Sequence, residues 1–141
     1  MSYDLAVFDV DVAPRDAQAF ERWFEEQTTW VGNRTYDDAS MASPPLRAWL
    51  AEMTREFAAM SAGSAVDDPR AGDYAIGPAL VYVAFGWSQA SRALRRAVEL
   101  AAKRGVGFFD VSGDGEPIWL ADELAAARGE WFSHSLLSRS R

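Results

Sequence analysis

The chain of 141 residues contains no cysteine and a single histidine, His134. The lack of cysteine excludes disulfides, thiolate nucleophiles and cysteine-ligated zinc or iron–sulfur clusters. A Ser-His-Asp site would have to use His134 with Ser133 or Ser135, but adjacent residues on a helix or strand do not face each other. The sequence therefore predicts no catalytic residues of this kind.

Membrane-spanning segments and an export signal are also lacking. The longest apolar run covers the nine residues 79–87, whereas a membrane-spanning helix needs about 20. The N-terminus, from Met1 to Asp4, is acidic where a signal peptide would be basic. The absence of cysteine fits a reducing compartment. We therefore expect a cytoplasmic protein with no membrane partner.

Glycine and acid motifs do not occur in the settings that hold cofactors or metals. The Gly-Val-Gly string at 105–107 lies between a predicted helix and a predicted strand, the reverse of the order in a phosphate-binding loop. Asp37-Asp38 and Asp67-Asp68 lack the alternating ligands of a calcium loop, and beside Tyr or Pro such pairs are typical of turns. The sequence predicts no cofactor and no metal site.

Positive charge is scarce, with 14 Lys and Arg against 21 Asp and Glu, so the net charge is −7. Residues 1–87 hold 14 acidic and 6 basic residues, whereas residues 88–141 hold 7 acidic and 8 basic ones. Binding to a phosphate backbone needs a basic surface, so we expect no nucleic-acid partner. The acidic part can instead attract a basic protein. We interpret the basic residues of the third predicted helix as a solvated face: Arg92, Arg95, Arg96, Lys103 and Arg104.

Apolar residues are abundant at 49%, which is enough to fill a core in a chain of this size. Their alternation predicts strands over 3–12, 73–76, 79–87 and 106–111, and a short edge strand over 118–120. Residues 3–12 are mostly apolar on both faces, which is typical of a strand that is central or covered on both sides. The run 79–87 shows the same pattern, and we expect it at the centre of the sheet. Helical spacing predicts a first helix that begins at Pro14 and a second and third that are capped by Ser43 and Ser88. It also predicts a small helix over 121–127.

This order of elements resembles a ferredoxin-like α+β fold, the split βαβ arrangement, with an antiparallel or mixed sheet. A helix pair occupies the first crossover. Two antiparallel helices would return the second strand in the wrong direction unless the loop 62–72 crosses back, and periodicity does not decide this. We expect a single domain over residues 1–120, followed by a C-terminal helical extension or tail over 121–141.

Several short strings look familiar together: YDLAVFD at 3–9, YDD at 36–38, DDPR at 67–70, DYAIG at 73–77, AFGWSQA at 84–90 and GVGFFDVS at 105–112. Up to Trp119 the chain resembles a set of small uncharacterised bacterial proteins that have no known activity. The resemblance implies a bacterial cytosolic origin and transfers no catalytic residue.

Carboxylates at predicted strand ends offer the one route to acid–base chemistry. Asp9, Asp11 and Asp110 lie at or near the ends of the first and last strands. Two neighbouring carboxylates can share a proton and act as acid and base. Asp9 and Asp110 would lie at the same end of the sheet if the two strands are parallel, and at opposite ends if they are antiparallel.

We favour a protein-binding module over an enzyme, because no catalytic constellation is present. The sharpest version is an immunity-type protein that sequesters a basic partner such as a toxin. Its partner-binding residues would be the exposed acids and a tryptophan predicted to lie in a loop: Trp30, Asp37, Asp38, Asp67, Asp68 and Asp73. The alternative is a small-molecule-binding protein or enzyme that uses an open sheet face, with a pocket lined by Tyr82, Trp87 and Phe109. A homo-oligomer that pairs through a sheet edge or the tail is the third hypothesis.

Overall fold

Four strands form one sheet in the computed structural model, which describes residues 2–32, 39–59, 70–113 and 117. The strands are β1 (Ser2–Phe8), β2 (Asp73–Ile76), β3 (Leu80–Gly86) and β4 (Gly107–Phe109). Their order is β2-β3-β1-β4, and every neighbouring pair is antiparallel. Because β1 and β2 are both antiparallel to β3, they run in the same direction. The chain between β1 and β2 therefore returns to the end of the sheet at which β1 begins. With helices packed on an antiparallel sheet, the fold class is α+β.

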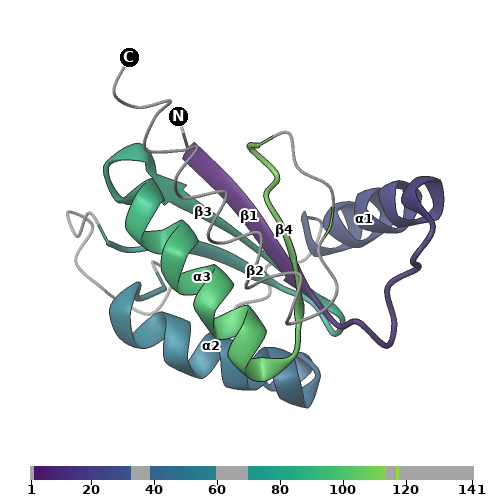
Figure 1. Cartoon of the computed structure of the whole chain (residues 1–141), viewed down its shortest axis with the longest axis horizontal. Coiled ribbons are helices and arrows are strands. Elements are labelled where there is room, and N and C mark those ends of the chain that lie inside the picture. Colours follow the sequence, from purple (N-terminus) through teal and green to yellow (C-terminus); the bar gives the residue numbers. More distant parts are fainter. Residues whose placement is uncertain (1, 33–38, 60–69, 114–116, 118–141) are drawn as a thin grey trace.

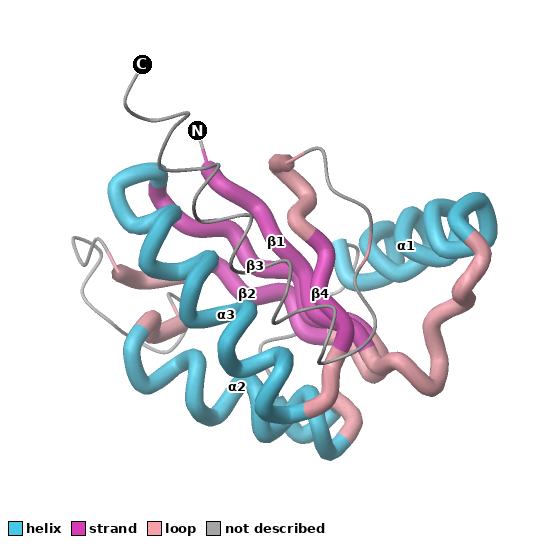
Figure 2. Tube along the Cα trace, viewed as in Figure 1, coloured by secondary structure: helices cyan, strands magenta, loops and turns pink. Residues whose placement is uncertain are grey.

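Three helices cover this sheet: α1 (Ala17–Gly32), α2 (Pro44–Glu56) and α3 (Ala90–Arg104). Short 3-10 turns, η1 (Ala39–Met41) and η3 (Trp87–Gln89), precede α2 and α3. Figure 1 shows α2 and α3 together on one side of the sheet and α1 alone on the other, and Figure 2 shows the same layers by element type. The two helices of the first crossover are therefore not an antiparallel pair packed on each other, since they lie on opposite faces of the sheet.

The larger core lies between the sheet and the α2–α3 layer. The predicted stripe of the second helix supplies Leu46, Trp49 and Met53, all fully buried. Val83 and Phe85 meet these side chains from β3, in the alternation expected from the sequence. The indole N–H of Trp49 donates a hydrogen bond of 3.1 Å to the carbonyl of Ala97, which ties α2 to α3.

A smaller, largely aromatic core lies under α1. Phe20 of α1 packs edge-on against Phe8 of β1, with ring centroids 5.0 Å apart. Trp23 and Phe24 continue the helix stripe, and Phe24 contacts Phe109 of β4 at 5.1 Å. Both faces of β1 and β3 are thus covered, as their two-sided apolar pattern predicted.

Turns at both ends of the sheet shorten two predicted strands. The first strand ends at Phe8 rather than at residue 12, because the amides of Val12 and Ala13 donate to the Asp9 carbonyl and the chain turns there. The last strand ends at Phe109, because the Gly113 amide donates to the Asp110 carbonyl at 3.2 Å.

The helix ends follow from local sequence. The Asp16 carboxylate accepts the Ala19 amide at 2.9 Å and caps α1. Ser43 occupies the N-cap position of α2, as predicted, although its side chain makes no capping hydrogen bond. The third helix begins at Ala90 after η3, so Ser88 is not its cap. Gly105 ends α3 at φ 72°, a left-handed conformation that favours glycine.

Within the described ranges, no helix is long and apolar enough to cross a membrane. The predicted edge strand over 118–120, the predicted helix over 121–127 and the C-terminal extension lie outside the described residues.

Candidate binding groove between α2 and α3

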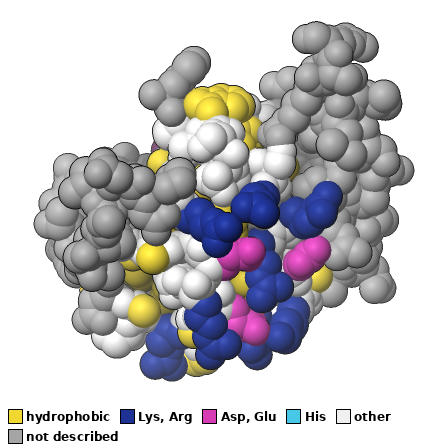
Figure 3. Space-filling model, turned by 90° about the vertical axis from the view of Figure 1, so that its left-hand side faces the viewer, with side chains coloured by type: hydrophobic (Ala, Val, Ile, Leu, Met, Phe, Trp, Pro, Cys, Tyr) yellow, Lys and Arg dark blue, Asp and Glu magenta, His cyan; other side chains and the backbone are white. Residues whose placement is uncertain are grey.

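A surface hollow of about 600 Å³ lies where α2, α3 and the segment before β2 meet. Its lining is entirely charged, and it is formed by five arginines and three glutamates: Glu52, Arg55, Glu56, Arg70, Arg92, Arg95, Arg96 and Glu99. We call this hollow the arginine groove. Figure 3, which views the α2–α3 side, shows Lys and Arg side chains gathered around a few Asp and Glu side chains.

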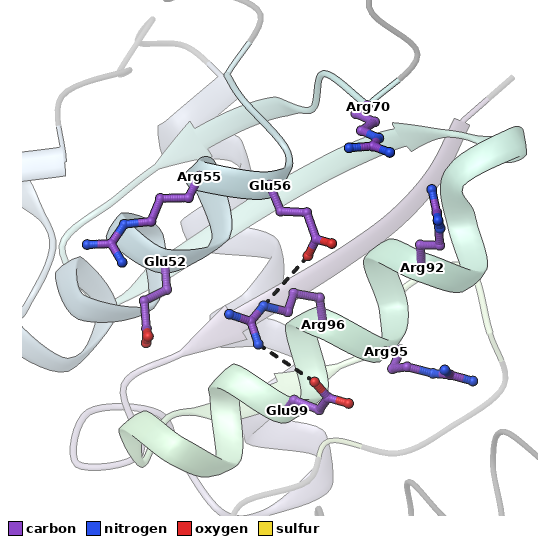
Figure 4. A pocket seen from close by; sticks show the side chains of 8 residues that line it. All are labelled: Glu52, Arg55, Glu56, Arg70, Arg92, Arg95, Arg96 and Glu99. Carbon is purple, nitrogen blue, oxygen red and sulfur yellow. Dashed lines mark ion pairs between the residues drawn. The ribbon is translucent and has the colours of Figure 1, made fainter.

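Helix geometry explains how the two helices supply this lining. On α2, the residues Glu52, Arg55 and Glu56 are three and four positions apart and therefore share one helix face. On α3, Arg92, Arg95, Arg96 and Glu99 repeat the same spacing. The opposite faces of both helices are apolar and buried against the sheet. Packing of the two helices side by side therefore places two charged faces along one groove (Figure 4).

Ion pairs hold part of the groove in place. Arg96 lies between Glu56 and Glu99, with N–O distances of 3.7 Å to each, as Figure 4 shows. At the far end of α3, Lys103 Nζ and Arg104 Nε each lie 2.8 Å from an oxygen of Glu52. The hydrogen bonds from Lys103 and Arg104 lower the pKa of Glu52 from its usual 4.5 to about 2. Glu52 is therefore ionised at neutral pH and fixes α2 to the C-terminal part of α3.

Two of the arginines are not compensated in this way. Arg55 and Arg92 are exposed, they come from the two different helices, and neither forms an ion pair with any residue that the structure describes. With these two included, five guanidinium groups and three carboxylates line the groove. Guanidinium donors match the planar oxygen pairs of carboxylates and phosphates. The groove can therefore hold an anionic group between its two helical walls.

Sequence reasoning noticed the arginines of α3 but interpreted them as a solvated face, and it did not single out Arg55 or Arg70. The spacing of charged residues on each helix was the available signal. It shows two charged helix faces, but only the packing of α2 against α3 brings these faces together.

The predicted partner-binding set lies largely beyond what the structure describes. Asp37, Asp38, Asp67 and Asp68 are outside the described residues. Trp30 is in α1, whose last turns extend past the predicted helix end, so its expected loop position is wrong; its side chain is outside the description. Of the six residues, Asp73 is the one whose side chain is placed, exposed at the start of β2.

The predicted ligand pocket is not one site. Tyr82 and Phe109 lie on the α1 side of the sheet and both contact Phe24 of α1. Trp87 is 50% exposed in η3 and packs edge-on against Tyr3, which belongs with the opposite core. Because α1 covers the face that carries Tyr82 and Phe109, this face is not the open surface that the small-molecule hypothesis assumed.

The carboxylates at the strand ends are also apart. β1 and β4 are antiparallel, with Ala6 opposite Phe109 and Phe8 opposite Gly107. Asp110 therefore lies beside Leu5, four positions along β1 from Asp9, or about 13 Å at the usual rise per residue. A proton shared between Asp9 and Asp110 is excluded by this register.

Two aspartates, Asp4 and Asp110, lie near the end of the sheet where β1 begins, and each instead accepts a hydrogen bond from a tyrosine. The Tyr3 hydroxyl donates to buried Asp110 at 2.6 Å. On the other face, the Tyr82 hydroxyl donates to Asp4, which also accepts from Ser2. Burial, followed by the bond to Asp4, raises the pKa of Tyr82. Both tyrosines act here as hydrogen-bond donors that secure the ends of β1, β3 and β4.

Comparison with known proteins gives no further guide: no family model, no curated protein and no solved structure matches the chain significantly. Within the described ranges, no group of three or more His, Asp or Glu side chains is arranged to hold a metal ion.

Proposed function

We propose that the protein is a binding module, and that the arginine groove holds an acidic segment of a protein partner. One observation carries this proposal. Arg55 and Arg92 line one hollow from two helices, and neither has an ion-pair partner among the described residues. The interspersed glutamates favour a polypeptide of mixed charge over a pure polyanion, because they would repel closely spaced phosphates.

The test is titration of a fluorescently labelled peptide, rich in glutamate but with interspersed lysines, into the full chain, read by anisotropy at low and high salt. We expect binding to wild type, and at least a roughly tenfold loss in the R55E/R92E variant, because like charges then face each other. R47E is the matched control, since Arg47 is exposed on α2 but does not line the groove. Equal binding by R55E/R92E and wild type would contradict the proposal.

The second candidate is the immunity-type protein that sequesters a basic partner. The charge distribution favours it: α3 carries four arginines and one lysine against one glutamate, although the whole chain has a net charge of −7. The remainder of the chain is therefore more acidic than the total suggests. Capture of one salt-sensitive basic protein, lost after charge reversal at Asp37, Asp38, Asp67, Asp68 and Asp73, would support this candidate.

We also propose that the fold is ferredoxin-like. Three features support this description: the order β2-β3-β1-β4, the antiparallel pairing of neighbouring strands, and the parallel direction of β1 and β2 on either side of β3. A bacterial origin, membership of the set of small bacterial proteins that the chain resembles, and a cytoplasmic location remain predictions of the sequence.

A further inference from the structure

The acidic side of α1 offers a charge match to the arginine groove. Glu21, Glu25 and Glu26 are exposed on α1. None of the three forms an ion pair with any residue in the described ranges. Glu21 and Glu25 are four positions apart and repel each other on one helix face. A cationic partner would relieve this repulsion.

The spacing of the α1 glutamates also matches that of the arginines on α3, and the hollow is large enough for their side chains. Glu21 and Glu25 are separated by about 6 Å along α1. Arg92 and Arg96, on one wall of the groove, have the same separation in sequence, and Arg55 lines the other wall. A hollow of about 600 Å³ accommodates a few long side chains. Glutamates from an incoming helix therefore fit between the two walls.

We propose that the partner of the arginine groove is a second copy of this chain, whose α1 glutamates bind between α2 and α3. This inference rests on the proposed function and names the acidic segment. Within one copy the two surfaces cannot meet, because α1 lies on one side of the sheet and α2 and α3 on the other (Figure 1). Each copy therefore donates α1 to one neighbour and receives α1 from another, which is a head-to-tail contact that does not stop at a dimer unless it closes into a ring.

The test is the mass of the full chain by light scattering over a concentration series. Salt should be about 0.01 M, where the Debye length is about 30 Å, and about 1 M, where it is about 3 Å. We expect the average mass to rise with concentration at low salt and to return to that of the monomer at high salt. A monomer at every concentration at low salt would overturn the inference.

Charge exchange identifies the contact. The variants E21K/E25K and R55E/R92E should each be monomeric, because each presents two surfaces of the same sign. An equimolar mixture of the two should associate again, because each variant then complements both surfaces of the other. D11K is the control: it adds positive charge at an exposed residue outside α1 and the groove, so it should associate as wild type does.

Other outcomes are equally decisive. Association that persists in E21K/E25K, or a mixture that stays monomeric, would overturn the inference. If R55E/R92E does not fold by circular dichroism, R55A/R92A replaces it and should be monomeric too. Peptide binding by a wild-type chain that is always monomeric would overturn self-association alone, whereas failure of both assays would remove the proposed function as well.

Discussion

The α2–α3 side and the α1 side of the sheet bury the two faces of the same strands in different ways. Under α2 and α3 lies the larger core, with 21 buried residues against five under α1 among those that the structure describes. Ion pairs join α2 to α3 above that core, whereas the exposed glutamates of α1 have none among the described residues. The comparison indicates that the α2–α3 layer stabilises the fold, while the α1 layer leaves carboxylates available for a partner.

The largest expected effect comes from removal of the biggest buried side chain on each side. Trp49→Ala should lower the free energy of unfolding by about 4–5 kcal/mol, because it opens a cavity and also removes the indole hydrogen bond to the Ala97 carbonyl. Phe20→Ala should cost about 3 kcal/mol or less, because its neighbours Trp23 and Phe24 are partly exposed and can close the gap. Urea unfolding of both variants measures the difference. A greater loss for Phe20→Ala would reverse the comparison.

A close approach on the α1 side gives the next effect. A Cβ added at Gly107 would overlap the Phe8 ring. Gly107→Ala should therefore cost about 1–3 kcal/mol through overpacking. Gly86→Ala is the control, since a Cβ there meets nothing within 4 Å. Thermal unfolding that gives the same midpoint for the two variants would show that β1 and β4 adjust at no cost.

On each side of the sheet, one tyrosine hydroxyl donates a hydrogen bond, and the stabilising effects of these two bonds can be compared. The Tyr74 hydroxyl donates to the Phe57 carbonyl at 2.6 Å on the α2–α3 side, and the Tyr82 hydroxyl donates to Asp4 on the α1 side. Tyr74→Phe and Tyr82→Phe should each cost about 1 kcal/mol at neutral pH.

The pH dependence of these variants checks the same bonds. Burial raises the pKa of both hydroxyls above the usual 10, so the unfolded chain ionises first. The contribution of the two hydroxyls to the free energy of unfolding is complete below about pH 10 and declines as the pH rises above that value. Wild type should therefore lose more stability than either variant between about pH 9 and 11 in urea unfolding. Parallel losses would contradict the role of these two groups.

The smallest effect concerns the ion pairs between α2 and α3. The pKa of Glu52 is lowered from 4.5 to about 2, so its stabilising effect is complete above pH 4.5 and is lost as the pH falls toward 2. Glu52→Gln should thus be less stable than wild type at pH 7, with the difference vanishing near pH 2. Glu26→Gln on α1 is the matched control and should differ little from wild type at any pH, because Glu26 has no ion pair within the described ranges. Chemical unfolding over a pH series measures both.

Much of the fold could be predicted because its signals are local. The stripe through Leu46, Trp49 and Met53 predicted α2, and the alternation of Val81, Val83 and Phe85 predicted β3. Strand ends were less predictable. Asp9 and Asp110 continue apolar runs, but each begins a turn through backbone hydrogen bonds that residue types alone do not specify.

The candidate site was predicted only in part. The basic residues of α3 were noticed, but their partners across the groove were not. Arg55 belongs to another helix and Arg70 to the segment before β2, so no short sequence window contains the site. The net charge of −7 also directed attention to the acids, because a total hides how charge is distributed over two faces.

By itself, the sequence determined which segments become helices and strands, which of their faces are apolar, and that β1 and β3 are covered on both sides. These properties depend on residues within one or two turns or pleats of each other. Only the tertiary structure decided that α1 covers one face while α2 and α3 cover the other. That choice depends on the path of the chain between elements, since both faces of the central strands are apolar and either could accept either helix. The same choice brings the arginines of α2 and α3 together and places the glutamates of α1 on the opposite side.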